Sequence, residues 1–181
     1  MSQATHAAFL RGMNVGGRRV TNDDLIEIVR AAGFDKPAAF LASGNLVFDA
    51  GRRKASTITS KLERAFESGL GYDVPTIVLT AAEVRAIADS NTLAEEQRKT
   101  KAKLQVILPR VQPDAKGRKR ALALQGPGDL LAFGEGALFW LPPGSVLDTE
   151  MDVPELERVL GGTTTRTKRT FERLAAKFFS D

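Results

Sequence analysis

The chain has 181 residues, with 26 Lys and Arg, 22 Asp and Glu, and no cysteine. This length allows one large or two small domains, each with a self-sufficient core. The absence of cysteine excludes thiol nucleophiles, thiolate metal sites and disulfides, and it fits a reducing cytoplasm. No apolar stretch approaches the ~18 residues typical of a membrane span, so we expect a soluble cytoplasmic protein.

The first predicted strand, residues 7–10, leads into a loop rich in glycine and arginine. Glycine lets the backbone adopt positive φ and lets a ligand approach the main chain closely, while arginine supplies fixed positive charge. These properties suggest a phosphate or carboxylate ligand, and a flexible surface loop with solvated arginines is the alternative. The residues concerned are Arg11, Gly12, Gly16, Gly17, Arg18 and Arg19.

This loop comes close to the nucleotide-binding pattern G-x-x-x-x-G-K-[ST] but departs from it at decisive positions. Arg18 replaces the lysine, and Arg19 replaces the magnesium-binding hydroxyl. The following helix is predicted to begin only at Thr21, beyond the end of the loop. The pattern therefore argues against a standard ATPase and leaves the nature of the anion open.

The remaining elements of the first half follow from apolar periodicity and from turn residues. Thr21 and Asp24 form a capping box for a helix that ends at Gly33. Next come a strand over residues 37–41, a turn over 42–45, a strand over 46–48, a helix from Ser56 or Thr57 to Gly69, and a strand over 74–79. Pro75 suggests that this last strand lies at a sheet edge or begins unpaired.

The order β-α-β-β-α-β predicts a ferredoxin-like half. In that arrangement the first and third strands are adjacent, so the turn containing Ser43, Gly44 and Asn45 could face the glycine loop. The same residue types also suit an ordinary hairpin turn for backbone reasons alone.

The second half repeats this order of elements. A helix over residues 81–89 precedes a linker over 90–103; then come a strand over 104–108, a helix over 114–124, strands over 130–133 and 137–141, a helix over 153–160, a strand over 163–167 and a helix over 168–179. We therefore predict an α+β protein with two ferredoxin-like halves, each with an antiparallel sheet, plus a linking helix and a C-terminal helix. The predicted domains are residues 1–89 and 104–181.

Positive charge is concentrated between Arg98 and Arg120, where nine basic residues accompany one acidic residue, Asp114. Such a segment can attract nucleic acid, although no aromatic residue is interleaved for base stacking. A solvated helix face and linker is the simpler interpretation. Another anion-binding candidate is Arg166, because it lies just before a helix N-terminus and could clamp an anion with two hydrogen bonds. An ordinary strand with Thr167 as the N-cap of the helix is the simpler interpretation.

Few residues of the familiar catalytic types are present. The only histidine, His6, lies near the terminus, where we expect a mobile or strand-edge residue. Ser-His-Asp and Cys-His chemistry and histidine-rich metal sites are therefore disfavoured, and we predict no metal, no cofactor and no assignable reaction. Phe9 and Phe48 are assigned to the core, because the aromatic pattern of RNA-recognition sheets is missing.

Four segments in order resemble the uncharacterised family called domain of unknown function 1697 (DUF1697): residues 10–17, 32–34, 43–48 and 164–166. The resemblance covers nearly the whole chain and implies an α+β protein with ferredoxin-like substructure and no established activity. Family members usually carry a lysine at the position of Arg18, a Ser-Lys pair within residues 148–153, and an Asn-Trp pair at residues 167–168. These departures direct attention to the first-half motifs.

Our preferred hypothesis is a protein that binds a small anionic ligand through the glycine loop, the adjacent turn and Arg166. The alternative is a nucleic-acid-binding module that uses residues 98–120, and a protein-interaction module with an exposed apolar sheet face is a third possibility. The oligomeric state is left open. The predicted ligand-binding residues are Arg11, Asn14, Gly16, Gly17, Arg18, Ser43, Asn45 and Arg166.

Overall fold

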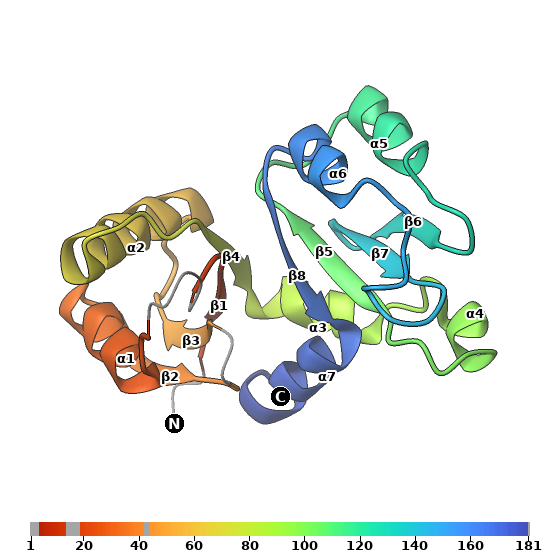
Figure 1. The fold of residues 1–181 in the computed structure, drawn as a ribbon. Helices are drawn as coiled ribbons and strands as arrows, with labels where there is room; N and C mark the ends of the chain where they lie inside the picture. The colour runs from red at the N-terminus through yellow and green to blue at the C-terminus, as the bar shows by residue number, and fades with distance from the viewer. Residues whose placement is uncertain (1–3, 14–18, 42–43, 181) are drawn as a thin grey trace. The chain divides into compact units, whose positions relative to one another are not determined.

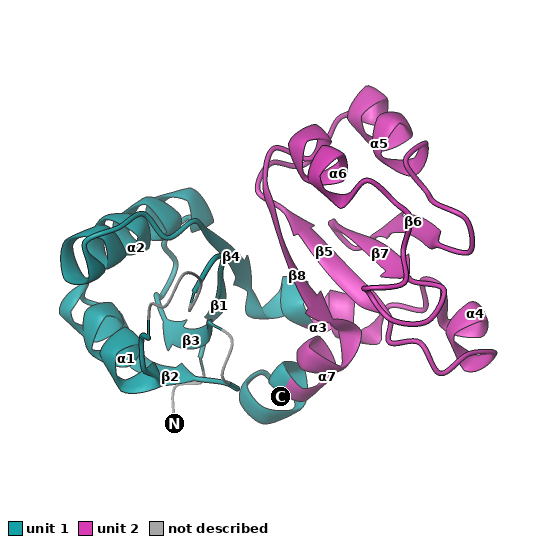
Figure 2. Cartoon of the chain, in the orientation of Figure 1, with its two compact units in different colours: residues 1–84, 174–181 teal, residues 85–173 magenta. Residues whose placement is uncertain are grey.

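A computed structural model describes residues 4–13, 19–41 and 44–180. Contacts divide the chain into two compact units (Figure 2). The first unit comprises residues 1–84 and 174–181, and the second comprises residues 85–173. No helix in the described ranges is both long enough and apolar enough to cross a membrane.

The first unit is built on a four-stranded antiparallel sheet (Figure 1). Its strands lie in the order β2-β3-β1-β4, so β1 and β3 are neighbours at the centre, as predicted. Strand β4 lies at an edge, in agreement with the position of Pro75 just before it. The bounds are β1 (His6–Leu10), β2 (Asp35–Ala39), β3 (Asn45–Asp49) and β4 (Thr76–Thr80).

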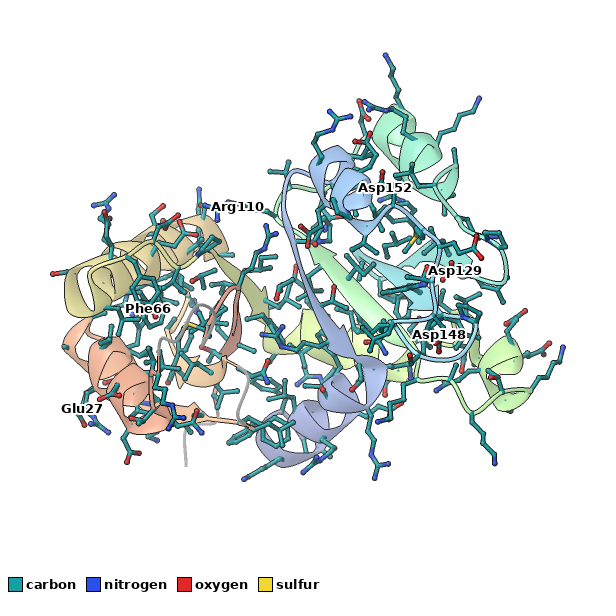
Figure 3. All side chains as sticks on the ribbon, viewed as in Figure 1. Glu27, Phe66, Arg110, Asp129, Asp148 and Asp152 are labelled. Atoms are coloured by element: carbon teal, nitrogen blue, oxygen red, sulfur yellow. The ribbon has the colours of Figure 1, made fainter. Side chains whose placement is uncertain are left out.

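Helices α1 (Asn22–Ala31) and α2 (Ala55–Leu70) cover one face of this sheet. Helix α1 begins with the predicted capping box, in which the Thr21 hydroxyl and the Asp24 carboxylate each accept a hydrogen bond from the other residue's backbone N–H. The apolar stripes of both helices pack on alternate residues of β1 and β3. Figure 3 shows Phe66 in this interior and Glu27 on the outer side of α1.

Strand β2 begins and ends two residues earlier than the sequence predicts. The apolar run over residues 38–41 extends the predicted strand to Leu41, but Leu41 has a φ of 62° and is exposed. The left-handed backbone at Leu41 departs from the extended conformation, and the chain turns there. The pairing of β2 with β3 is also irregular between Asp35 and Ala38.

The second unit has the same arrangement, with a four-stranded antiparallel sheet in the order β6-β7-β5-β8. Helices α5 (Ala115–Leu122) and α6 (Val153–Val159) contact each other and cover one face of the sheet, where Ile107, Leu138 and Trp140 are buried. The strands are β5 (Gln105–Pro109), β6 (Leu130–Gly134), β7 (Ala137–Leu141) and β8 (Thr163–Thr167). The predicted α+β fold with two similar halves is therefore confirmed.

Three further helices complete the described chain: α3 (Ala81–Asp89), α4 (Ala94–Arg98) and α7 (Lys168–Phe178). Helix α4 lies inside the segment predicted as a linker, because five residues are too few to show helical periodicity. The contact boundaries fall within α3 and α7, between Val84 and Arg85 and between Arg173 and Leu174. The division into domains 1–89 and 104–181 with a linker at 90–103 remains a prediction about independent folding.

A buried carboxylate holds the long segment after β7 in the second unit. Asp129 is 1% exposed, and its two oxygens accept hydrogen bonds from the Trp140 indole N–H and the Thr149 hydroxyl, each at 2.6 Å. Its carboxylate also leaves no room for a side chain at Gly126, where an added Cβ would lie 2.8 Å from the Asp129 Oδ2. Asp129, labelled in Figure 3, therefore joins three separate parts of this unit.

Asp129→Ala should lower the free energy of unfolding by about 2–3 kcal/mol, because it leaves the buried Trp140 indole N–H and the half-buried Thr149 hydroxyl without this acceptor. Urea denaturation measures this loss. Asp89→Ala removes an exposed carboxylate in the same unit and should change stability by less than about 0.5 kcal/mol. Equal effects of the two substitutions would contradict the structural role given to Asp129.

Candidate functional site

The end of β1 is held on both sides by backbone hydrogen bonds. The Leu10 N–H donates to the Gly44 carbonyl at 2.8 Å, and the Arg11 N–H donates to the Pro75 carbonyl at 2.9 Å. Arg11 thus leaves the sheet at the edge where β3 and β4 begin. Its side chain is half-buried and makes further contacts with the protein.

The turn before β3 packs directly against the beginning of the glycine loop. An added Cβ at Gly44 would lie 3.0 Å from the Leu10 Cβ and 3.1 Å from the Met13 Cγ. Gly44 also has a φ of 66°, so both conformation and space require glycine. The described residues therefore bring the loop and the turn together, as the strand order predicts.

Asn45 occupies this junction in a structural role. It is 1% exposed, and its side-chain amide donates to the Phe40 carbonyl at 3.1 Å. The Asn45 carbonyl in turn accepts from the Phe40 N–H at 2.9 Å. These two bonds close the turn between β2 and β3 and so position the backbone next to Arg11. Ligand contact by the Asn45 side chain remains a prediction.

Several predicted site residues lie outside the described residues: Asn14, Gly16, Gly17, Arg18 and Ser43. The described residues on either side of the loop are Met13 and Arg19, and Arg19 is exposed. Gly12, at the start of the loop, has a φ of 68° and no described atom within 4 Å of an added Cβ. Glycine is therefore required there by backbone conformation alone.

Arg166 belongs to the second unit, in the edge strand β8. Its Nη1 donates to the Thr164 hydroxyl and to the Thr165 carbonyl, both at 2.8 Å. Burial lowers the pKa of the Arg166 guanidinium to about 10, so the side chain is still charged at neutral pH. Its expected position beside Arg11 and Asn45 stays a prediction.

His6 is the first residue of the central strand β1 and is 4% exposed, so the expected mobile or edge position is wrong. Its ring stacks on Phe48, and its Nδ1 lies 2.8 Å from the Thr5 hydroxyl, which donates to Asp49. Burial lowers the pKa of His6 from its ordinary value of 6.5, although the carboxylates of Asp49 and Glu83 partly oppose this effect. The terminal location in the sequence did not reveal that β1 includes this residue.

The basic segment between residues 98 and 120 is divided by strand β5. Residues 98–103 precede the strand and residues 110–120 follow it, so a strand about 13 Å long lies between them. On α5, Arg118 lies over the Phe133 ring and Arg120 lies 3.8 Å from a Glu155 oxygen. The cations of this segment therefore form two groups, one before β5 and one after it. Figure 1 shows the chain before and after β5 at opposite ends of this strand.

The cations before β5 share a pocket with one further cation, which the sequence analysis did not select. Arg169, in the first turn of α7, lines the same pocket as Arg98, Lys101 and Lys103. The alternation of lysine and apolar residues over 101–104 was the signal available in the sequence for the two lysines, and the structure shows both of them exposed. Phe9 and Phe48 are fully buried, as predicted, and offer no surface for base stacking.

Within the described ranges, no group of three or more His, Cys, Asp or Glu side chains is arranged to hold a metal ion. The arrangement at the end of β1 instead combines an arginine, a backbone fixed at two points and a glycine at positive φ. These features suit recognition of an anion by main-chain N–H groups and guanidinium.

Comparison with known proteins identifies the family. Residues 3–139 match the model described as protein of unknown function (DUF1697), and the chain belongs to this family. Its fold is similar to that of the conserved bacterial protein SP0830 from Streptococcus pneumoniae, with a TM-score of 0.72 and 18% sequence identity. The similarity covers 97% of this chain and 98% of that chain, and at this identity it shows the fold alone. No curated protein matches the sequence.

Gly44→Ala should destabilise the protein more than Gly12→Ala does. Both substitutions place alanine at positive φ, which costs about 1–2 kcal/mol. Only Gly44→Ala also forces a Cβ against Leu10 and Met13, which adds about 1 kcal/mol or more. Chemical denaturation measures the free energy of unfolding of both variants. Equal losses would show that Gly44 is not in close contact with Leu10 and Met13.

The pKa of His6 should lie below that of the same residue in an unfolded peptide of residues 4–8. The unfolded chain then binds a proton at higher pH than the folded protein, so stability falls as the pH drops through 6.5. Because His6 is the only histidine, its ring proton can be followed by NMR without ambiguity. A folded-state pKa equal to or above the peptide value would contradict its burial.

Proposed function

We propose that this DUF1697 protein binds a small ligand bearing a phosphate or carboxylate at the loop after β1. The observation that carries the proposal is the junction of loop and turn, where the Leu10 N–H bonds to the Gly44 carbonyl and Gly44 packs on Met13. The ligand-binding residues proposed in the first unit are Arg11, Asn14, Gly16, Gly17, Arg18, Ser43 and Asn45.

The backbone at the start of the loop is fixed by hydrogen bonds. Backbone bonds to Gly44 and Pro75 hold residues 10 and 11, so Arg11 starts from a defined position. A preorganised cation loses little freedom on binding, which favours affinity for a small anion. The glycines that follow in the sequence allow close approach of a ligand to main-chain N–H groups.

Electrostatic attraction accounts for binding and assigns no reaction. Arginine forks match the oxygens of phosphate and carboxylate, and the charge-assisted hydrogen bonds they form are stronger than neutral ones. The proposed ligand is therefore an anion of metabolite size, held by guanidinium groups and backbone.

The alternative function is nucleic-acid binding by residues 98–120. The division of this segment by β5 gives it less support, because a strand of nucleic acid follows a continuous groove of cations. The buried positions of Phe9 and Phe48 also remove the stacking surface that RNA-recognition sheets use.

A thermal-shift screen with nucleotides, phosphosugars and carboxylates tests the proposal. We expect at least one class to raise the melting temperature of the wild-type protein, as binding to the folded state requires. Arg11→Ala and Arg18→Ala should each abolish most of that shift. Lys116→Ala removes an exposed cation from the second unit and should leave the shift unchanged.

Two results would contradict the proposal. One is a screen in which no anion stabilises the protein. The other is a screen in which every stabilising anion keeps its full effect in both Arg11→Ala and Arg18→Ala.

A further inference from the structure

A pocket of about 520 Å³ lies in the second unit. It is lined by the end of α4, the segment leading to β5, the end of β8 and the first turn of α7. The polar residues that define it are Arg98, Thr100, Lys101, Lys103, Thr167 and Arg169.

Four of these side chains are cations, and no carboxylate lines the pocket. Arg98, Lys101, Lys103 and Arg169 are all exposed, and the described part of the chain offers none of them an ion-pair partner within 4 Å. Other cations of this unit are paired: Arg158 with Glu155, and Lys168 with Glu172. Four unpaired charges of one sign around a cavity repel one another, and a bound anion would relieve that repulsion.

Hydrogen bonds hold the pocket wall in place before any ligand binds. The Ala102 N–H donates to the Thr100 hydroxyl at 3.1 Å, and the Gln105 side-chain amide donates to the Lys103 carbonyl at 2.7 Å. Ala102 and Leu104 are buried while Lys101 and Lys103 are exposed. This alternation directs both lysines to the same side of the segment.

The opposite wall is joined to this segment by backbone. Gln105 pairs with Thr167 across β5 and β8, and the Lys168 N–H donates to the Leu104 carbonyl at 2.9 Å. Arg169 is therefore held beside the two lysines although 66 positions separate it from Lys103 in the sequence. The four cations come from α4, the segment before β5 and α7, and they line the same pocket.

We propose that this pocket binds an oligophosphate, a ligand with two or three consecutive phosphate groups. A single phosphate would leave most of the 520 Å³ empty, whereas a triphosphate carries enough charge to meet all four cations. The Thr100 and Thr167 hydroxyls add neutral hydrogen-bonding groups. No aromatic residue lines the pocket, so the phosphates rather than a base are recognised.

Isothermal titration calorimetry with sodium tripolyphosphate tests this site on the full chain. The wild-type protein should bind one tripolyphosphate, and Lys101→Gln combined with Lys103→Gln should weaken binding about tenfold or more. Arg169→Gln should weaken it as well. The matched control is Lys99→Gln combined with Lys116→Gln, which removes the same charge from positions outside the pocket and should change affinity less than about twofold.

Two further ligands identify the source of the phosphates. Equal affinity for ATP and tripolyphosphate would support recognition of the phosphate chain itself. Tighter binding of a thymidine oligonucleotide than of tripolyphosphate, lost in the Lys99 and Lys116 control, would overturn the proposal in favour of a nucleic-acid surface. Absence of tripolyphosphate binding, or equal weakening by the control and the pocket variants, would also overturn it.

Arg11→Ala and Arg18→Ala separate this proposal from the one for the loop after β1. Both residues belong to the first unit, so both variants should keep tripolyphosphate binding that depends on Lys101 and Lys103. If tripolyphosphate binding did not depend on the two lysines, the proposal for the pocket would be contradicted. The proposal for the loop after β1 would not be affected.

Discussion

The first unit depends on the way its central strand ends. Strand β1 has β3 on one side and β4 on the other, and its last backbone donors are taken by carbonyls of Gly44 and Pro75. The chain then leaves the sheet at Gly12 with a φ of 68°. Three segments far apart in the sequence thus meet at one edge, and the proposed anion site is built on that meeting.

Much of this arrangement could be predicted from local patterns. The capping box at Thr21, the amphipathic helices and the order of elements together predict the sheet order, because a β-α-β-β-α-β chain has few ways to bury its apolar faces. The sequence did not predict where Leu41 turns out of the strand, since an apolar residue at positive φ gives no local signal. It also did not reveal the role of the Asn45 side-chain amide, which donates to the Phe40 carbonyl and closes the turn between β2 and β3.

The basic residues show a second limit of prediction from the sequence. A linear count finds nine cations between residues 98 and 120, but β5 separates them into two groups. Pairing of β5 with β8 then adds Arg169 to the first group. Non-local strand pairing decides which charges share a surface, so a charge run in the sequence is an incomplete guide to a binding site.

The claim that the loop after β1 holds an anion can be tested by an NMR titration with inorganic phosphate. Inorganic phosphate should shift the backbone amide signals of residues 11–19 and 43–45 with one shared dissociation constant, and Arg11→Ala should weaken that constant. Shifts spread over exposed lysines and arginines, with none at residues 11–19, would contradict the claim.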